Sequence, residues 1–446
     1  MALTGIQIYK LLPQTNCKEC GFPTCLAFAM KLAAKQVELA DCPYVSEDSQ
    51  AQLAESAAPP IRLVALKSDG HESKAGNEVV LFRHEKTFYH MPGIFLRIMD
   101  TEAEADIKAK VSAADAYKVN YVGIDLSIDG FAVASVSGDA GKFSQAVSVV
   151  RKASQKPLVL MSRDPEIMKA GLESLSGETP LIYGADANNW EAMAILAKEQ
   201  KCALGVIDTT LDGLADLTQK ITDKGLEDLV VDPGGRDFSS GLTYNTQIRR
   251  LSLKKNFRPL GFPIIAFPGD VGDSGLESML AAQAISKYAG FIVIDNFSPA
   301  TVYPLLVLRQ NIYTDPQKPI QVQPGLYEIN APKPEDPLLV TTNFSITYFS
   351  VANEVEGSGL PAWLLVTDAE GMSVLTAWAA GKFDAERIAK AVKEFNVADK
   401  ISKKQVVLPG HVAVLSGELE EELPGWAIKV GPREAVDLPS YMKQVL

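Results

Sequence analysis

The chain has 446 residues, 47% of them hydrophobic and 22% charged, which is enough for about two to four domains with sizeable apolar cores. Its formal net charge is −12 and it shows no compact basic patch, so nucleic acids and anionic membranes are excluded as expected partners. No apolar run approaches the roughly 18 residues that cross a bilayer, and no secretion signal is evident, so we expect a cytoplasmic protein.

The N-terminal segment holds four of the five cysteines: Cys17, Cys20, Cys25 and Cys42. A [4Fe–4S] cluster needs four thiolates around one point, and a C-x2-C pair places two sulfurs together. Gly21 and Pro23 bend the chain so that Cys25 supplies a third thiolate, and Cys42 closes the cage. We expect a helix over about residues 24–36, whose unpaired first-turn N–H groups near Cys25 would favour an anionic cluster.

The same four thiolates could bind zinc, but zinc sites usually pair two C-x2-C halves of comparable spacing. Here three cysteines lie together and the fourth is distant and followed by proline, as in ferredoxin-like sequences. A disulfide framework is not expected, because the cysteines crowd into one segment of a cytoplasmic protein. Cys202 stands alone in an expected strand and is interpreted as a buried free thiol.

Residues 55–60 are interpreted as a linker, because paired prolines cannot continue a helix. They end a cluster domain of residues 1–57. Residues 58–92 are expected to form a linker and a segment that caps the next domain, with short strands at residues 62–66 and 79–82.

From residue 93 onward, short apolar runs rich in β-formers recur eight times, at residues 94–98, 121–124, 158–161, 181–183, 203–207, 229–231, 264–267 and 291–294. Helical stretches separate them, as at residues 103–116, 190–199, 275–288 and 300–309. Strand–helix alternation of this kind indicates parallel βαβ units. Eight units predict a closed (β/α)8 (TIM) barrel over residues 93–325.

A proline-rich stretch at residues 331–337 marks a second boundary. Beyond it we expect strands at residues 338–342, 362–367, 406–408 and 427–430, and helices at residues 345–356, 372–380 and 384–395. This smaller α/β pattern predicts an open, Rossmann-like sheet over residues 326–446.

The Cys17-x2-Cys20-Gly-Phe-Pro-x-Cys25-x2-Phe-Ala motif, the Cys42-Pro ending and the stretch before Cys17 resemble one known family. It is the large (gamma) subunit family of the corrinoid/iron–sulfur proteins of the reductive acetyl-CoA pathway of carbon dioxide fixation. Other redox subunits share the cluster motif, so the two later domains are needed to narrow the choice. The resemblance covers the whole chain and implies that the C-terminal domain binds a corrinoid, a cobalt-containing cobalamin.

The resemblance implies a methyl-group carrier rather than a free-standing enzyme. Its cobalt(I) would accept a methyl group from methyltetrahydrofolate through a separate methyltransferase and deliver it to acetyl-CoA synthase/CO dehydrogenase. The cluster would return accidentally oxidised cobalt(II) to cobalt(I). A smaller barrel subunit is the implied partner in a heterodimer.

Ligands of open α/β sheets bind at the carboxyl ends of the strands. Together with the resemblance, this makes nine residues at and after these strand ends candidates for corrinoid binding: Thr341, Thr347, Gly371, Met372, Ser373, Val374, Thr376, Gly410 and Arg433. Gly371 would let the backbone approach a flat macrocycle, and the hydroxyls of Thr347, Ser373 and Thr376 would reach the corrin amides or the lower face of the cobalt.

The positions of the four histidines agree with the resemblance. None of the four histidines lies in the Asp-x-His-x-x-Gly motif with which many cobalamin proteins offer imidazole to cobalt. We therefore expect no strong lower ligand from this chain, and His411 is interpreted as stabilising a loop.

The barrel raises a rival hypothesis. Residues 231–235, with Asp232 followed by Pro-Gly-Gly, resemble the Asp-Pro-Gly turn of pterin-binding barrels, and Asp125, Asn188 and Asn189 follow expected strands. A barrel that binds methyltetrahydrofolate would make this chain a methyltransferase with an iron–sulfur redox centre. Because the resemblance assigns that task to a separate enzyme, these residues are interpreted as structural.

Overall fold

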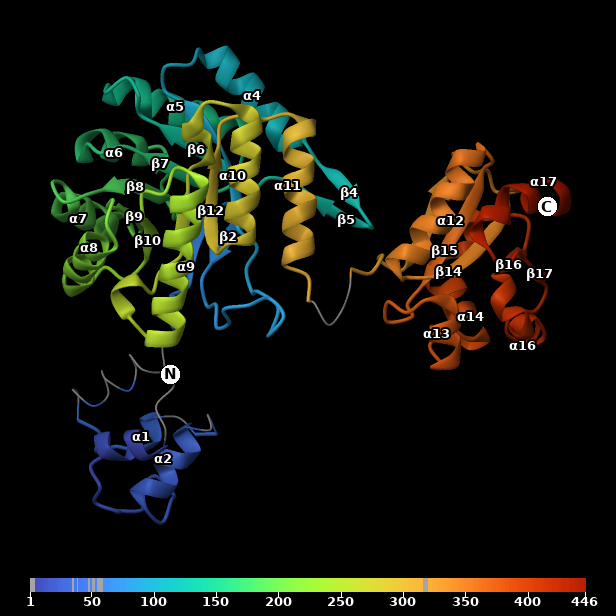
Figure 1. The fold of residues 1–446 in the computed structure, drawn as a ribbon, viewed down its shortest axis with the longest axis horizontal. Coiled ribbons are helices and arrows are strands. Elements are labelled where there is room, and N and C mark those ends of the chain that lie inside the picture. Colours follow the sequence, from blue (N-terminus) through green and yellow to red (C-terminus); the bar gives the residue numbers. More distant parts are fainter. Residues whose placement is uncertain are drawn as a thin grey trace. The chain divides into compact units, whose positions relative to one another are not determined.

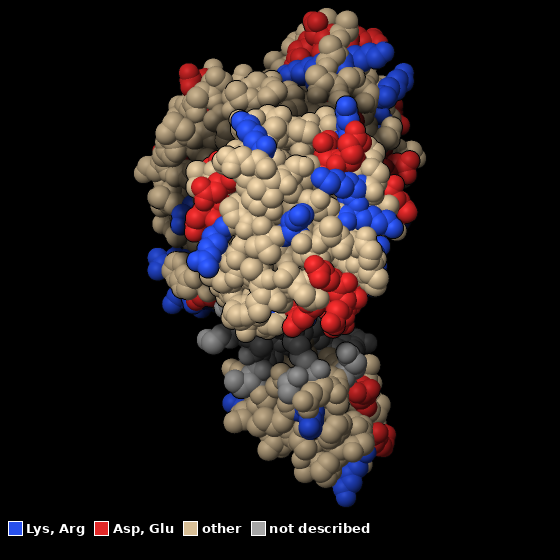
Figure 2. Space-filling model, turned by 90° about the vertical axis from the view of Figure 1, so that its right-hand side faces the viewer, with Lys and Arg blue, Asp and Glu red and all other residues tan. Residues whose placement is uncertain are grey.

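The computed structural model describes residues 5–33, 36–37, 39–46, 49, 53, 59–315 and 320–446 (Figure 1). Its contacts group the chain into two units, one of Met1–Tyr117 with Ser127–Tyr313 and one of Lys118–Leu126 with Thr314–Leu446. In the described part of the chain, no helix is long and apolar enough to cross a membrane. On the face drawn in Figure 2, Lys and Arg alternate with Asp and Glu across wide uncharged areas.

The cysteine-rich segment folds around α1 (Gly5–Leu11), α2 (Cys25–Ala33) and the 3-10 helix η1 (Leu39–Asp41). Ile8, Leu12 and Phe28 form its small apolar core, to which Cys25 and Cys42 also belong. The predicted helix over residues 24–36 begins at Cys25 and is described to Ala33. Residues 34–35, residue 54 and residues 55–58 of the predicted linker lie outside the described residues.

A hairpin covers the amino-terminal end of the barrel. It pairs β1 (Val64–Ser68) with β2 (His71–Ala75), and Val64 and Leu66 are buried among side chains of the barrel interior. The predicted strand at residues 79–82 is wrong, because β2 takes its place as the partner of β1. The reason is the Asp69-Gly70 pair between Ser68 and His71, a hairpin turn signal in which Gly70 adopts the positive φ that glycine tolerates best.

Eight parallel strands close into a barrel, which confirms the predicted fold class. They are β3 (Gly93–Met99), β6 (Gly130–Ala134), β7 (Leu158–Met161), β8 (Leu181–Ala185), β9 (Ala203–Ile207), β10 (Leu229–Asp232), β11 (Ile264–Ala266) and β12 (Ala289–Ile294). The helices that follow them are α4 (Glu104–Ala116), α5 (Ala140–Ala153), α6 (Pro165–Leu172), α7 (Trp190–Gln200), α8 (Leu211–Asp223), α9 (Phe238–Lys255), α10 (Ser274–Ser286) and α11 (Pro299–Ile312).

One of the eight predicted strands is wrong. Residues 121–124 are not in the barrel but form the turn of an antiparallel hairpin, β4 (Val119–Tyr121) and β5 (Ile124–Leu126), which belongs to the second unit. Val122 and Gly123 both have positive φ, as a two-residue hairpin turn requires. The second barrel strand is β6, whose five residues are all buried.

The second unit is built on a five-stranded sheet in the order β13-β15-β14-β16-β17. Four strands are parallel, β14 (Leu338–Thr342), β15 (Ala362–Thr367), β16 (Gln405–Leu408) and β17 (Ala427–Val430), and β13 (Gly325–Ile329) is an antiparallel edge. One face packs on α12 (Ser345–Ser358) and α17 (Leu438–Val445). The other packs on α13 (Val374–Ala379), α14 (Ala385–Glu394) and α16 (Ser416–Glu422).

The hairpin β4–β5 is part of the packing of this second unit. The N–H of Gln323 donates to the carbonyl of Val122 at 3.2 Å, and Val122 is buried with Val322 and Leu339. A segment that lies between a helix and a strand of the barrel in the sequence therefore contributes to the core of the C-terminal sheet.

Candidate cofactor sites

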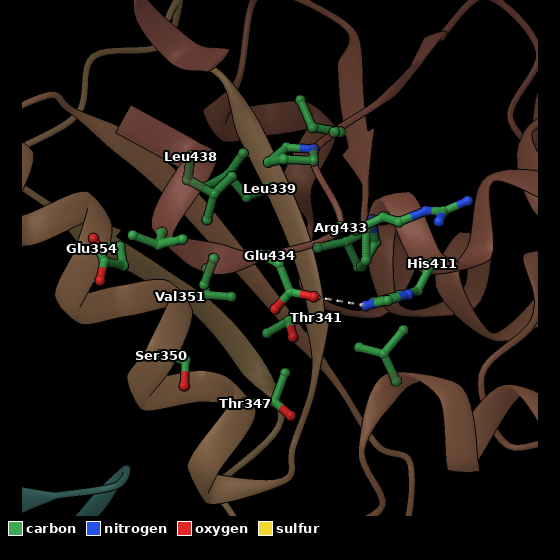
Figure 3. A pocket seen from close by; sticks show the side chains of 18 of the residues that line it. Leu339, Thr341, Thr347, Ser350, Val351, Glu354, His411, Arg433, Glu434 and Leu438 are labelled. Carbon is green, nitrogen blue, oxygen red and sulfur yellow. Dashed lines mark ion pairs between the residues drawn. The ribbon is translucent and has the colours of Figure 1, made fainter. Parts of the chain in front are cut away.

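A crevice opens where the strand order of the C-terminal sheet reverses. Chain order runs from β14 to β15 on one side and then back across β14 to β16 on the other. In doubly wound sheets, ligands bind outside the carboxyl ends of the strands at this switch point. A cavity of about 580 Å³ lies there, walled by the ends of β14, β16 and β17 and by α12 (Figure 3).

Thr341, near the end of β14, is the most telling residue of the cavity lining. Its side chain is 1% exposed, and its Oγ1 has no hydrogen-bond partner in the part of the chain that the structure describes. Thr347 and Ser350 from α12 lie near it on the same side of the cavity (Figure 3). An unpaired buried hydroxyl costs free energy, so a ligand with a polar group would gain by pairing with it.

The opposite wall is made of two loops held back to back. The N–H of Gly410 donates to the carbonyl of Pro432 at 2.9 Å, and the N–H of Gly431 donates to the carbonyl of Leu408 at 2.8 Å. A Cβ on Gly410 would lie 2.6 Å from the carbonyl oxygen of Gly431, so only glycine permits this approach. The joined loops present His411 and Arg433 to the cavity.

Five of the nine predicted corrinoid residues line this cavity: Thr341, Thr347, Ser373, Val374 and Arg433. The structure places Gly371, Met372, Thr376 and Gly410 outside the lining, each within two residues of a residue that belongs to it. Thr376 is exposed, with its hydroxyl 3.0 Å from that of Ser373. Whether these nine residues contact a corrinoid stays a prediction.

Gly371 also has a structural role within the protein itself. It has φ +72°, and its N–H donates to Oδ1 of Asn343 at 3.0 Å. A Cβ at this position would meet the side chain of Gln321 rather than the cavity. The glycine therefore allows a left-handed turn that packs on Gln321.

Sequence reasoning missed several residues of this region. Asn343 is 1% exposed, and its Oδ1 accepts N–H groups of Ala369 and Gly371, which fixes the loop after β15. A signal was present, because Asn343 directly follows a buried strand. Ser350, Glu354 and Glu434 of the lining carried no comparable signal, since α12 and the loop after β17 become neighbours only in the folded sheet.

The four cysteines lie in one compact segment. Cys25 and Cys42 are buried, Cys20 is half-buried and Cys17 is exposed. Burial raises the pKa of the Cys42 thiol, a backbone hydrogen bond with Tyr44 lowers it, and the charges of Cys20, Cys25 and Cys17 raise it. In the described residues, no three His, Cys, Asp or Glu side chains are placed so that they could hold a metal ion. Four thiols within one short segment are nevertheless the donor set that a [4Fe–4S] cluster requires.

The N–H groups in the first turn of α2 were expected to be unpaired, but the N–H of Cys25 has a partner. It donates to Oδ1 of Asn16 at 2.8 Å, so that this expectation is wrong. Asn16, which precedes the cysteine motif by one residue, is a contact that the spacing of the cysteines did not predict.

The carboxyl end of the barrel is filled by charged side chains that bind one another. Asp232, 0% exposed, accepts two hydrogen bonds from Arg236 at 2.6 and 2.9 Å and one from the hydroxyl of Tyr183 at 2.6 Å. Although burial lowers the pKa of Arg236, its bonds to Asp232 raise that pKa above its ordinary value. Arg236 also binds Asp270, which in turn accepts from Arg97 at 2.6 Å. The Asp-Pro-Gly turn is therefore already occupied.

The other polar residues named in the rival hypothesis are also engaged or elsewhere. Asn189 donates to the carbonyls of Arg163 and Gly184, and its Oδ1 accepts the N–H of Asp186 at 2.7 Å. Asn188 is exposed, and Asp125 lies in β5, outside the barrel. Cys202 is 2% exposed, and burial raises the pKa of its thiol to about 12, so it is a buried free thiol as predicted.

Comparison with known proteins places the chain in a family. Residues 64–442 match a family model described as CO dehydrogenase/acetyl-CoA synthase delta subunit, and residues 12–44 match one described as a putative Fe-S cluster. A solved dihydropteroate synthase from Xanthomonas albilineans covers 57% of this chain at 14% identity with a TM-score of 0.38, too slight a likeness to carry an argument.

Full-length relatives are more informative. The corrinoid/iron–sulfur protein large subunit of Moorella thermoacetica is 44% identical over 444 residues, 99% of either chain. The acetyl-CoA decarbonylase/synthase complex subunit gamma of Methanopyrus kandleri is 34% identical over 99% of this chain and 98% of its own. These matches span the cluster segment as well as the barrel and the C-terminal sheet. The chain therefore belongs to the corrinoid/iron–sulfur protein large-subunit family.

Proposed function

We propose that this protein is a methyl-group carrier that binds a corrinoid in the crevice of its C-terminal sheet and a [4Fe–4S] cluster on its four N-terminal cysteines. The observation that carries the proposal is the cavity of about 580 Å³ at the switch point between β14 and β16. The name of the Moorella relative supports the nature of both cofactors.

The lining suits a large ligand that is mostly apolar but carries polar groups at its edges. Leu339, Val351 and Leu438 supply apolar surface, while Thr341 offers its unpaired hydroxyl and Arg433 a charge. When bound, the corrinoid supplies a cobalt centre that takes up a methyl group and passes it on. The chain's own part is to hold this ligand and to keep water from one side of it.

His411 is the one histidine of the four that lines the cavity. Its Nε2 lies 3.7 Å from Oε1 of Glu434. We propose that His411 and Glu434 stabilise the loop wall together and that no histidine of this chain serves as a strong lower ligand of the cobalt.

The finer part of the proposal concerns the reaction partners. The methyl donor is methyltetrahydrofolate, acting through a separate methyltransferase, and the acceptor is acetyl-CoA synthase/CO dehydrogenase. A small barrel subunit completes a heterodimer, and the cluster returns oxidised cobalt to its reactive state. The description of several relatives as subunits of an acetyl-CoA decarbonylase/synthase complex supports this setting.

Cofactor content of the anaerobically purified full chain tests the proposal. We expect about four irons and one corrinoid per chain. Cys42→Ala should lose the iron and keep the corrinoid, whereas Cys202→Ala, a change to a buried thiol in the barrel, should keep both. A full chain that binds no corrinoid would refute the carrier proposal, and unchanged iron in Cys42→Ala would refute the cluster ligands.

The rival function, a barrel that binds methyltetrahydrofolate, receives no support from the structure. The carboxylate of Asp232 is already bound by Arg236 and Tyr183, and the cavity beside it measures about 30 Å³, against about 580 Å³ in the C-terminal crevice. Methyl transfer from methyltetrahydrofolate by this chain alone would reverse this conclusion.

A further inference from the structure

Asn16 makes two hydrogen bonds with Cys25, in opposite directions. Its side-chain Oδ1 accepts the backbone N–H of Cys25 at 2.8 Å. Its own backbone N–H donates to Sγ of Cys25, with 3.4 Å between nitrogen and sulfur. The two bonds fix the chain just before Cys17 against the first residue of α2.

The backbone of this loop has an unusual conformation that makes the second bond possible. Asn16 has φ +51°, and positive φ also occurs at Gln14 and Lys18, so that left-handed residues alternate with others along the loop. Asparagine adopts the left-handed region more readily than most residues. Where a left-handed residue adjoins a right-handed one, successive N–H groups turn toward a common side and bind anions, including those of iron–sulfur sites.

We propose that Asn16 is a positioning residue that raises the reduction potential of the cluster by donating its backbone N–H to the sulfur of Cys25. The inference rests on the proposed [4Fe–4S] ligation and extends it. Reduction adds one electron and increases the negative charge on the sulfurs, so an N–H donor to a ligating sulfur favours the reduced cluster. The side-chain bond to the N–H of Cys25 keeps this donor in place.

Because Cys25 is buried, the hydrogen bond from the N–H of Asn16 to its sulfur cannot be replaced by one from water. Cys25 is 4% exposed and packs with Phe28 and Ala29, so water cannot replace a lost N–H donor on its sulfur. A second cysteine of the segment, Cys42, also has a backbone hydrogen bond, with Tyr44. The hydroxyl of Tyr44 donates to the carboxylate of Glu19 at the surface and reaches no sulfur.

Asn16→Gly tests the proposal, because glycine keeps the positive φ but removes the Oδ1 acceptor. We expect a cluster with unchanged iron content and a lower midpoint potential in a redox titration followed by electron paramagnetic resonance. Gln14→Gly is the matched control, since it changes a neighbouring left-handed residue whose side-chain amide donates to the carbonyl of Tyr9 rather than to a cysteine. An unchanged potential in Asn16→Gly, or an equal drop in Gln14→Gly, would overturn the proposal.

A measurement on the unaltered full chain covers the case in which Asn16→Gly does not retain its cluster. Asn16 is the only asparagine among residues 1–57, so selective ¹⁵N-asparagine labelling marks it within this segment. We expect an isotropic ¹⁵N coupling to the reduced cluster in pulsed resonance spectra, and its absence would contradict the N–H···S bond. If the proposed cluster itself were wrong, the unaltered chain would show neither four irons nor a reduced-cluster signal. That result differs from the failure of the Asn16 proposal, in which both would be present.

Discussion

The crevice of the C-terminal sheet and the mouth of the barrel lie at the same kind of place, the carboxyl ends of parallel strands. In the crevice, the hydroxyl of Thr341 stays unpaired beside a cavity of about 580 Å³. At the barrel mouth, Arg236 donates to both Asp232 and Asp270, and the cavity left there measures about 30 Å³. The comparison teaches that strand ends supply a possible site, and that the mutual pairing of their side chains decides whether it stays open.

The largest expected effect comes from opening the barrel network with Arg236→Leu. The change leaves the carboxylate of Asp232, whose side chain is 1% exposed, without its charged partner. We expect a loss of about 3–5 kcal/mol in the free energy of unfolding, measured by urea denaturation, with corrinoid content unchanged.

A matched control is Arg163→Leu, which removes an exposed arginine that lies 3.6 Å from Asp186 at the same end of the barrel. A surface pair of this kind contributes at most about 1 kcal/mol. Equal losses in the two variants would mean that the barrel network is no more important than a surface ion pair.

Tyr183→Phe weakens the same network less. It removes one hydrogen bond to a buried carboxylate, for an expected loss of about 1.5–3 kcal/mol. Burial, and next the charge of Asp232, raise the pKa of Tyr183 well above its ordinary value, so the folded protein keeps this phenol protonated.

The pH dependence follows from that shift. The contribution of Tyr183 to stability is fully present below the unfolded pKa of about 10 and is lost as the pH rises above it. Tyr183→Phe should therefore lose stability less steeply than the unaltered protein above pH 10. If the stability of the two proteins fell equally steeply with pH in alkaline denaturation, the raised pKa of Tyr183 would be contradicted.

Gly410→Ala should damage the open site instead. The added Cβ would lie 2.6 Å from the carbonyl oxygen of Gly431, so the two loops that form one wall must separate. We expect corrinoid affinity to fall about tenfold or more, equivalent to about 1.4 kcal/mol, while iron content stays constant.

Gly417→Ala in α16 is the matched control for this wall, because nothing lies within 4 Å of a Cβ at that position. It should leave corrinoid binding unchanged. If Gly410→Ala binds corrinoid as the unaltered protein does, the loop wall is not part of the site.

Thr341→Val is the smallest change, since it replaces a hydroxyl by a methyl group of similar size. Without ligand, stability should hold or rise, because an unpaired buried hydroxyl is removed. Corrinoid affinity should fall by about 0.5–1.5 kcal/mol if the ligand pairs with this hydroxyl, as measured by equilibrium titration. Unchanged affinity would show that the ligand does not use Thr341.

Local sequence signals predicted much of this molecule. The spacing of Cys17, Cys20, Cys25 and Cys42, and the alternation of strands and helices, depend on residues close together in the chain. The strand ends that carry Thr341 and Arg433 could also be read in this way, because the end of a strand is a local property.

What the tertiary structure decided depends on contacts between distant segments. Residues 121–124 and 130–134 are both short and apolar, and only pairing with β3 and β7 selects the second as the barrel strand. The carboxylate of Asp232 could have met a ligand, and only the fold shows that Arg236 and Tyr183 already bind it. Likewise Ser350 and Glu434 line one crevice because α12 and the loop after β17 meet there. The sequence by itself determined which helices and strands form and which residues could bind a ligand. The packing of distant elements decided which of those residues remain free to bind one. The reason is that a polar group that is already hydrogen-bonded within the protein is no longer available to a ligand.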